Sequence, residues 1–302
     1  MDVISDILRL LNLRSSVYFH ASFCGSWAID GKNPHQATFH LIARGNCWLH
    51  LTGQDKNQNK NIALTGGDLV VFPREVAHTI SDSMQPPEKI DNLPVPAAAD
   101  EIPSTSLICG YFDFESPQIN PLLAAMPDVV HIKNEDPTRT SAMNSLLNFI
   151  TVETETAGPG SEAMIDKLTE LLFIHVVRAY IKQSNVSRGV LAALADKSMS
   201  KVVSAIHKDP SVKWSVEKLA EQSGMSRSAF AKYFQRVVNM TPMQYVTHWR
   251  MQVAYETLRN TKTPVVIIAE QSGYQTEASF RKAFKDVTGE NPGAVRKGIS
   301  IK

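Results

Sequence analysis

Hydrophobic and polar positions in the first 115 residues follow the short pattern of β-strands. Residues 37–53 read ATFHLIARGNCWLHLTG, and residues 61–80 read NIALTGGDLVVFPREVAHTI, with a Gly-Gly-Asp turn before a short apolar run. Several short strands at this spacing are typical of a small barrel or sandwich. Residues 84–106 are rich in Pro and Ala and lack periodicity, which predicts a long surface loop between two strands.

The pattern becomes helical after this β-rich part. One predicted helix ends at the sequence Gly-Pro-Gly at residues 158–160, and a second runs from about residue 162 to residue 183. An apolar stripe on the second helix contains Ile165, Leu168, Leu172 and Val176, broadened by Leu171 and Ile174. Either this wide stripe packs entirely within its own domain, or part of it contacts a second subunit.

The C-terminal third contains two copies of a similar sequence, here called the repeated phrase. The copies are LAEQSGMSRSAF at residues 219–230 and IAEQSGYQTEASF at residues 268–280. Each copy predicts a short helix that stops at a glycine, followed by a second helix capped by Ser226 or Thr276. The pairs Phe230/Phe234 and Phe280/Phe284 are four residues apart, so each pair lies on one helix face and is expected to be buried. Each copy therefore predicts a helix-turn-helix.

The opposite face of each second helix is then expected to be exposed. Its candidate DNA-contacting residues are Arg227, Ser228, Ala231, Lys232 and Arg236 in the first copy, and Glu277, Ala278, Arg281, Lys282 and Lys285 in the second. Residues 242–260 form an uninterrupted helical pattern, long enough to hold two reading helices about one DNA turn, ~34 Å, apart. The alternative is a duplicated helical domain that binds another protein.

Charge favours the DNA interpretation. The net charge of the chain is +1, but residues 197–302 carry +9 and residues 1–196 carry −8. A basic third attached to an acidic body indicates that one part meets a polyanion. A composition of 43% hydrophobic and 20% charged residues, without a long apolar run or signal peptide, predicts a cytoplasmic protein with no membrane partner. Three scattered cysteines exclude a disulfide framework or a zinc finger.

The repeated region, about residues 198–297, resembles the DNA-binding domain of the AraC-type transcription regulators. The segments FHLIARGNCWLHL, GGDLVVFPREVAH, LICGYFDF and NPLLAAMPDVVHI are similar to the cupin-type sensor of one branch of that family. The resemblance implies an α+β multidomain protein: a cupin-like β-barrel with accessory helices at 1–183, a linker at 184–197, and an all-α domain with two helix-turn-helix units at 198–302. Its expected partners are double-stranded DNA, a second copy in a homodimer, and RNA polymerase, as for an activator.

Within that branch, the chain looks most like regulators that respond to reactive chlorine through two cysteines, and Cys24 and Cys109 match their positions. The effector implied is an oxidant or a small molecule. Free cysteines are usually buried as small hydrophobes, so we favour a core role for both over a redox switch. Cys47 is a still weaker candidate for a redox switch.

His35, His40 and His78 are weak candidates for a metal site, since a cupin barrel can gather imidazoles from separate strands. Metal-dependent cupins show a His-x-His pair with a following Glu, whereas Thr38 precedes His40 here and no carboxylate follows at that spacing. We therefore expect no metal, no cofactor and no enzyme activity, and His78 is expected to be a hydrogen-bonded core residue. The alternative is a cupin metalloenzyme attached to a DNA-binding domain. The sequence leaves the effector, the operator and the sign of regulation open.

Overall fold

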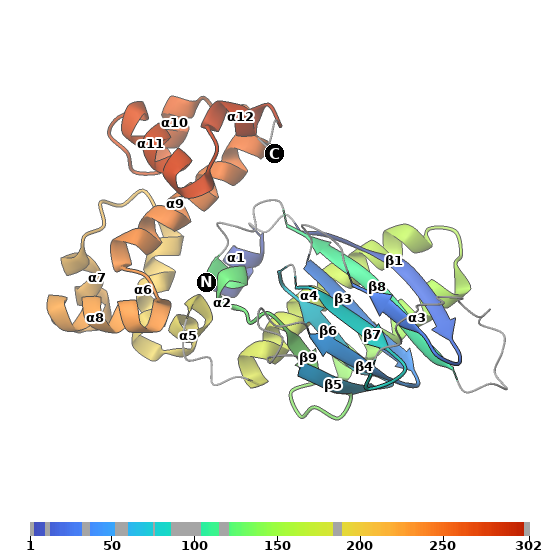
Figure 1. The fold of residues 1–302 in the computed structure, drawn as a ribbon. Helices are drawn as coiled ribbons and strands as arrows, with labels where there is room; N and C mark the ends of the chain where they lie inside the picture. The colour runs from blue at the N-terminus through green and yellow to red at the C-terminus, as the bar shows by residue number, and fades with distance from the viewer. Residues whose placement is uncertain are drawn as a thin grey trace. The chain divides into compact units, whose positions relative to one another are not determined.

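The computed structural model describes residues 3–9, 13–31, 37–51, 60–74, 76–85, 104–114, 121–183 and 189–298. The chain divides into two compact units (Figure 1). The β unit contains Leu13–Phe114 and Met126–Gln183, and the helical unit contains Met1–Asn12, Glu115–Ala125 and Ser184–Lys302. Most of the predicted long loop, residues 86–103, lies outside the described residues.

Two antiparallel sheets form the β unit. Their strands are β1 (Arg14–Phe23), β2 (Ala28–Asp30), β3 (Ala37–Arg44), β4 (Asn46–Leu51), β5 (Lys60–Thr65), β6 (Leu69–Phe72), β7 (His78–Ser81), β8 (Thr105–Asp113) and β9 (Val130–Ile132). One sheet has the order β1-β8-β3-β6-β9, and the other has the order β2-β7-β4-β5. The predicted strands are present, but they form two separate sheets where a barrel was predicted.

The core of the β unit draws on both sheets. A cluster of buried side chains joins Ile42 and Leu107 of the first sheet to Leu49 and Ile80 of the second, with Trp27 between strands β1 and β2. Alternating side chains of a strand point to opposite faces, so each sheet can contribute every second residue to such a cluster. This shared core holds the two sheets against each other.

A helical hairpin belongs to the β unit as well. Helix α3 (Ser141–Thr156) packs against α4 (Ser161–Gln183), and α4 packs on β1. The rings of Phe173 on α4 and Phe112 on β8 have centroids 5.2 Å apart. Leu172 and Val176 of the predicted stripe are buried, whereas Leu171 is 50% exposed. Helix α3 ends before residues 158–160, as predicted.

The helical unit contains α1 (Val3–Arg9), α2 (Pro121–Ala125), α5 (Val190–Ala195), α6 (Lys197–Lys208), α7 (Val216–Ser223), α8 (Arg227–Val238), α9 (Pro242–Asn260), α10 (Val265–Gln271), α11 (Glu277–Thr288) and α12 (Pro292–Arg296). Helix α1 packs against α6, α2 against α5, and α5 against α8. Helix α5 lies in residues 184–197, the range predicted as a linker. In the described part of the chain, no helix is both long and apolar enough to cross a membrane.

The two copies of the repeated phrase fold as predicted from local signals. Ser226 accepts a hydrogen bond from the Ala229 amide at the start of α8, and Thr276 accepts one from the Ser279 amide at the start of α11. Gly224, with φ of 69°, ends α7 in the left-handed region that glycine adopts without strain. The phenylalanine pairs of α8 and α11 are fully buried. Helix α9, from Pro242 to Asn260, has the predicted bounds.

Candidate functional site

The outward face of α8 carries the first set of candidate DNA contacts. Arg227, Ser228, Lys232 and Arg236 are exposed, and Ala231 is half-buried. The Nε atom of Arg227 lies 2.6 Å from Oε1 of Glu217 on α7. The guanidinium carbon of Arg236 lies 4.8 Å from the centroid of the Tyr233 ring. An exposed ion pair and an exposed cation–π contact each contribute little stability, so both arginines can exchange these partners for phosphate or a base.

The outward face of α11 carries the second set. Ala278, Arg281, Lys282 and Lys285 are exposed, and Glu277 is half-buried. Arg281 forms an ion pair with Glu277 one turn earlier on the same helix, with an N–O distance of 2.5 Å. On each helix the side opposite the buried phenylalanines carries three of the predicted residues: Ser228, Lys232 and Arg236 on α8, and Ala278, Lys282 and Lys285 on α11. Arg227 and Glu277 stand in the first turn, three residues before a phenylalanine and therefore nearer its side. The side opposite the phenylalanines can donate hydrogen bonds to phosphates and base edges.

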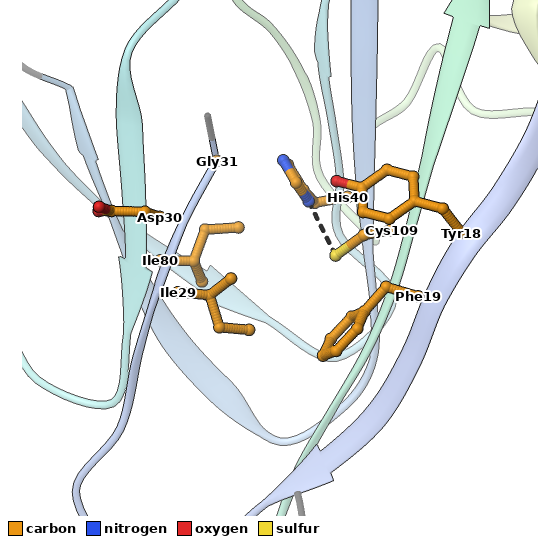
Figure 2. A pocket seen from close by; sticks show the side chains of 8 residues that line it. All are labelled: Tyr18, Phe19, Ile29, Asp30, Gly31, His40, Ile80 and Cys109. Carbon is orange, nitrogen blue, oxygen red and sulfur yellow. Dashed lines mark hydrogen bonds between the residues drawn. The ribbon is translucent and has the colours of Figure 1, made fainter. Parts of the chain in front are cut away.

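A second candidate site is a pocket of about 300 Å³ within the β unit (Figure 2). Its lining residues are Tyr18, Phe19, Ile29, Asp30, Gly31, His40, Ile80 and Cys109. The strand pairings explain why they meet: Cys109 of β8 lies opposite Phe19 of β1 on one side and His40 of β3 on the other. In the other sheet, Ile29 lies opposite Ile80. The pocket thus takes its walls from both sheets.

A directed chain of hydrogen bonds runs along one side of this pocket. Nδ1 of His78 lies 2.7 Å from the carbonyl oxygen of Val76, which can only accept, so this nitrogen carries the proton. Nε2 of His78 is then the acceptor for Nε2–H of His40, at 2.8 Å. Nδ1 of His40 is left as an acceptor, and the thiol of Cys109 donates to it across 3.0 Å. One backbone carbonyl therefore fixes both imidazole tautomers.

Burial keeps the members of this chain uncharged. Burial and the neighbouring His78 hold the pKa of His40 well below its usual range, and burial also lowers the pKa of His78. Burial raises the pKa of the Cys109 thiol. His78 is a hydrogen-bonded core residue, as predicted. At neutral pH this series of hydrogen bonds therefore joins two neutral imidazoles and a thiol.

The two cysteines predicted as a candidate switch occupy different places. Cys24 is half-buried and follows Phe23, whose partner across β1 and β8 is Thr105. Cys109 is buried and lies opposite Phe19. Cys24 is thus five residues beyond the position opposite Cys109, which corresponds to roughly 16 Å along an extended strand. A disulfide needs Cα atoms within about 7 Å of each other. This strand register does not bring the two thiols together. Cys47 is buried, which raises its pKa to about 12.

The histidines named as weak metal candidates are only partly assembled. His35 lies outside the described residues. His40 and His78 face each other, but both imidazole nitrogens of each already make a hydrogen bond. Across the described ranges, no group of three or more His, Cys, Asp or Glu side chains is placed to hold a metal ion.

Comparisons with known proteins cover both units. A cupin family model matches residues 2–182, and a helix-turn-helix domain model matches residues 219–298. The transcriptional regulator AlkR of Acinetobacter baylyi is 31% identical, over 97% of this chain and 98% of AlkR. A putative AraC-like transcription regulator of Streptomyces antibioticus is 30% identical, over 98% of this chain and 99% of its own length. This chain belongs to the AraC-type transcription regulators.

The regulator therefore combines an N-terminal cupin domain with a C-terminal DNA-binding helix-turn-helix domain. The RCS-specific transcriptional activator RclR of Escherichia coli is also similar, with 27% identity over 99% of this chain and 98% of RclR. The family resemblance stated from the sequence is confirmed. Sequence reasoning missed Tyr18, Phe19, Ile29 and Ile80 as pocket residues, because single apolar positions in strands carry no local sign of a cavity.

Proposed function

We propose that the regulator reads DNA with two helix-turn-helix units, α7–α8 and α10–α11, and that α8 and α11 enter the major groove. One observation supports this most strongly. In both pairs the second helix buries two phenylalanines and turns its basic residues to solvent. A helix that only stabilised the fold would not need the same outward chemistry twice.

The exposed side chains suit different contacts. Arg281 and Lys282, next to each other on α11, can donate to base edges or phosphates, and Lys232 occupies the outward face of α8. Ser228 and Ala278 are small residues near the first turn, where short side chains let the helix backbone approach the groove. Lys285 and Arg236 lie further along their helices and suit phosphate contacts.

DNA affinity tests this assignment. A duplex selected from a random pool is titrated with the full chain and with a Lys232→Ala, Arg281→Ala, Lys282→Ala triple variant at several salt concentrations. Each lost base contact is expected to weaken binding by about 1–3 kcal/mol, whereas each lost phosphate contact lowers the salt slope by about one. Alanine at Arg14, Lys60 and Lys133, exposed cations of the β unit, gives the same charge change and serves as the control. Equal affinity and slope in both triple variants would refute the placement.

We propose further that the regulator is a homodimer joined through α3 and α4. These two helices pack together and carry exposed apolar side chains, with Phe149 62%, Val152 46%, Met164 52% and Leu171 50% exposed. Burying such side chains in a second copy would remove them from water. Two subunits would present four reading units and gain affinity through effective concentration.

For the signal, we propose that the pocket of the β unit is the effector site. The pocket has the size of a small-molecule site, and residues of both sheets line it. An oxidant switch through Cys24 and Cys109 is the second candidate, favoured by the similarity to RclR, whose name describes it as RCS-specific. That switch requires β1 and β8 to shift, since their register separates the two cysteines. The relatives named here are regulators, which favours this function over a cupin metalloenzyme.

A further inference from the structure

We propose that the pocket of the β unit binds a small, uncharged and mostly apolar molecule with one hydrogen-bond acceptor, held by the hydroxyl of Tyr18. The inference deepens the proposed function in one respect, because such a molecule would be the regulator's effector. Binding to the pocket can nevertheless be measured without DNA.

The apolar character comes from three side chains. Ile29 and Ile80 of one sheet face Phe19 of the other across the pocket (Figure 2). Its volume of about 300 Å³ is what about ten water molecules occupy in liquid water. The space therefore suits a molecule of about ten non-hydrogen atoms, such as one substituted aromatic ring.

The polar handle follows from the hydrogen bonds already made. Both ring nitrogens of His40 and the thiol proton of Cys109 are already used in the series of hydrogen bonds that ends at the carbonyl oxygen of Val76. Tyr18 lines the pocket together with His40 and Cys109, and its hydroxyl points toward the side chain of His40 in Figure 2. Among the described residues this hydroxyl has no hydrogen-bond partner. Burial of part of this side chain raises its pKa, so the phenol keeps its proton. Tyr18 is thus a donor that can serve a ligand acceptor.

The charges around the pocket exclude an ionic ligand. None of the described lining residues is a Lys or Arg, so a carboxylate would enter without a counter-charge. The carboxylate of Asp30 points away from the other lining side chains in Figure 2 and accepts a hydrogen bond from Thr79 at 3.0 Å. An ammonium in the pocket would therefore also lack a facing partner. An unpaired ion in an apolar site loses its hydration without compensation.

Calorimetric titration of the full chain with four probes of similar size tests the proposal. Acetophenone carries one acceptor, ethylbenzene has none, benzoate is an anion and 1-phenylethylamine is a cation at neutral pH. Acetophenone is expected to bind saturably, with benzoate and the amine weaker by about tenfold or more. Tyr18→Phe is expected to weaken the binding of acetophenone by about fivefold and to leave the affinity for ethylbenzene unchanged. Tyr111→Phe is the matched control, because Tyr111 stacks on Tyr18 without lining the pocket.

Three results would overturn the proposal: no saturable binding of acetophenone, tighter binding of benzoate than of acetophenone, or no effect of Tyr18→Phe. Ile29→Phe should fill the pocket and abolish binding of both neutral probes. If this variant does not fold, Tyr18→Phe still decides, because Tyr18 is 49% exposed and the loss of one hydroxyl is tolerated there. The triple variant of α8 and α11 should bind acetophenone normally, so a failure of the DNA assignment is separately visible.

Discussion

The thiol of Cys109 donates to Nδ1 of His40 across 3.0 Å, inside the β unit. This imidazole cannot withdraw the thiol proton easily, because burial and the neighbouring His78 hold the pKa of His40 low. Burial raises the pKa of Cys109 at the same time. The pair therefore stabilises a neutral thiol, and thiolates are the reactive form of cysteine.

Alkylation of the native chain should consequently discriminate between the cysteines. Cys24 is half-buried, whereas Cys47 and Cys109 are buried with raised pKa values. With iodoacetamide at pH 8, followed by mass spectrometry, Cys24 is expected to react at least about tenfold faster than the other two. Unfolding in urea should equalise the three rates. A Cys24–Cys109 disulfide after mild oxidation would instead show that β1 and β8 can shift their register.

The exposed apolar residues of α3 and α4 predict a dimer that charge can disrupt. Phe149→Glu combined with Leu171→Glu places two carboxylates on that surface and is expected to shift sedimentation of the full chain to the monomer at tens of micromolar. Lys60→Glu, at an exposed position of β5 outside α3 and α4, changes the charge of the subunit by the same amount, so it is the control and should leave the dimer intact. Unaltered sedimentation of the double variant would place the interface elsewhere.

The two N-caps predict equal effects in the two repeated units. Ser226→Ala and Thr276→Ala each remove a hydrogen bond to an amide of the first helical turn, and each should cost about 1 kcal/mol of unfolding free energy. Ser228→Ala changes an exposed residue two positions into α8 and should stay within about 0.5 kcal/mol. Urea denaturation measures all three. A cap variant as stable as the control would mean that the hydrogen bond contributes nothing.

Acid should weaken the helical unit through His207. Its ring stacks on Trp249 and its Nε2 lies 2.8 Å from the hydroxyl of Tyr245. Burial lowers the pKa of His207 to about 3, below the unfolded value of about 6.5. Between these two pKa values the unfolded chain binds a proton at His207 and the folded chain does not. The unfolding free energy is therefore unaffected by His207 above pH 6.5, and it falls by up to about 1.4 kcal/mol per pH unit as the pH drops from 6.5 towards 3.

The variant His207→Phe keeps the stacking and removes the titration. Its unfolding free energy, followed by tryptophan fluorescence between pH 7 and 5, should fall less steeply than that of the unaltered chain. His40 and His78 in the β unit also have lowered pKa values and contribute equally to both curves. Parallel curves would show that His207 titrates normally.

The helical unit was largely predictable because its signals are local. A capping residue, a glycine with positive φ and a phenylalanine pair all act within a few positions of one another, as at Ser226, Gly224 and Phe230. The bounds of α9 followed from its unbroken pattern and the proline at its first position. No partner far along the chain had to be identified for these elements.

The pocket was not predictable in the same way. Phe19 meets Cys109 only because β1 pairs with β8, ninety residues later, and nothing near either residue specifies that register. The same holds for the separation into two sheets, which depends on which strands pair. The exposed face of α4 was open from sequence, because a stripe alone does not say which of its residues the sheet covers.

The path of the chain between the two units has a practical consequence. It crosses from one unit to the other four times, since α1 and α2 belong to the helical unit although β1–β8 lie between them in sequence. Ile7, Leu122 and Leu123 are buried on these two helices. If the chain is cut at residue 183, the C-terminal fragment lacks α1 and α2, and these two helices remain on the N-terminal fragment without the helices they pack against. Domain-swap chimeras joined there, a common way to rewire regulators, should express poorly, and a transplantable version must carry α1 and α2 with the DNA-reading half.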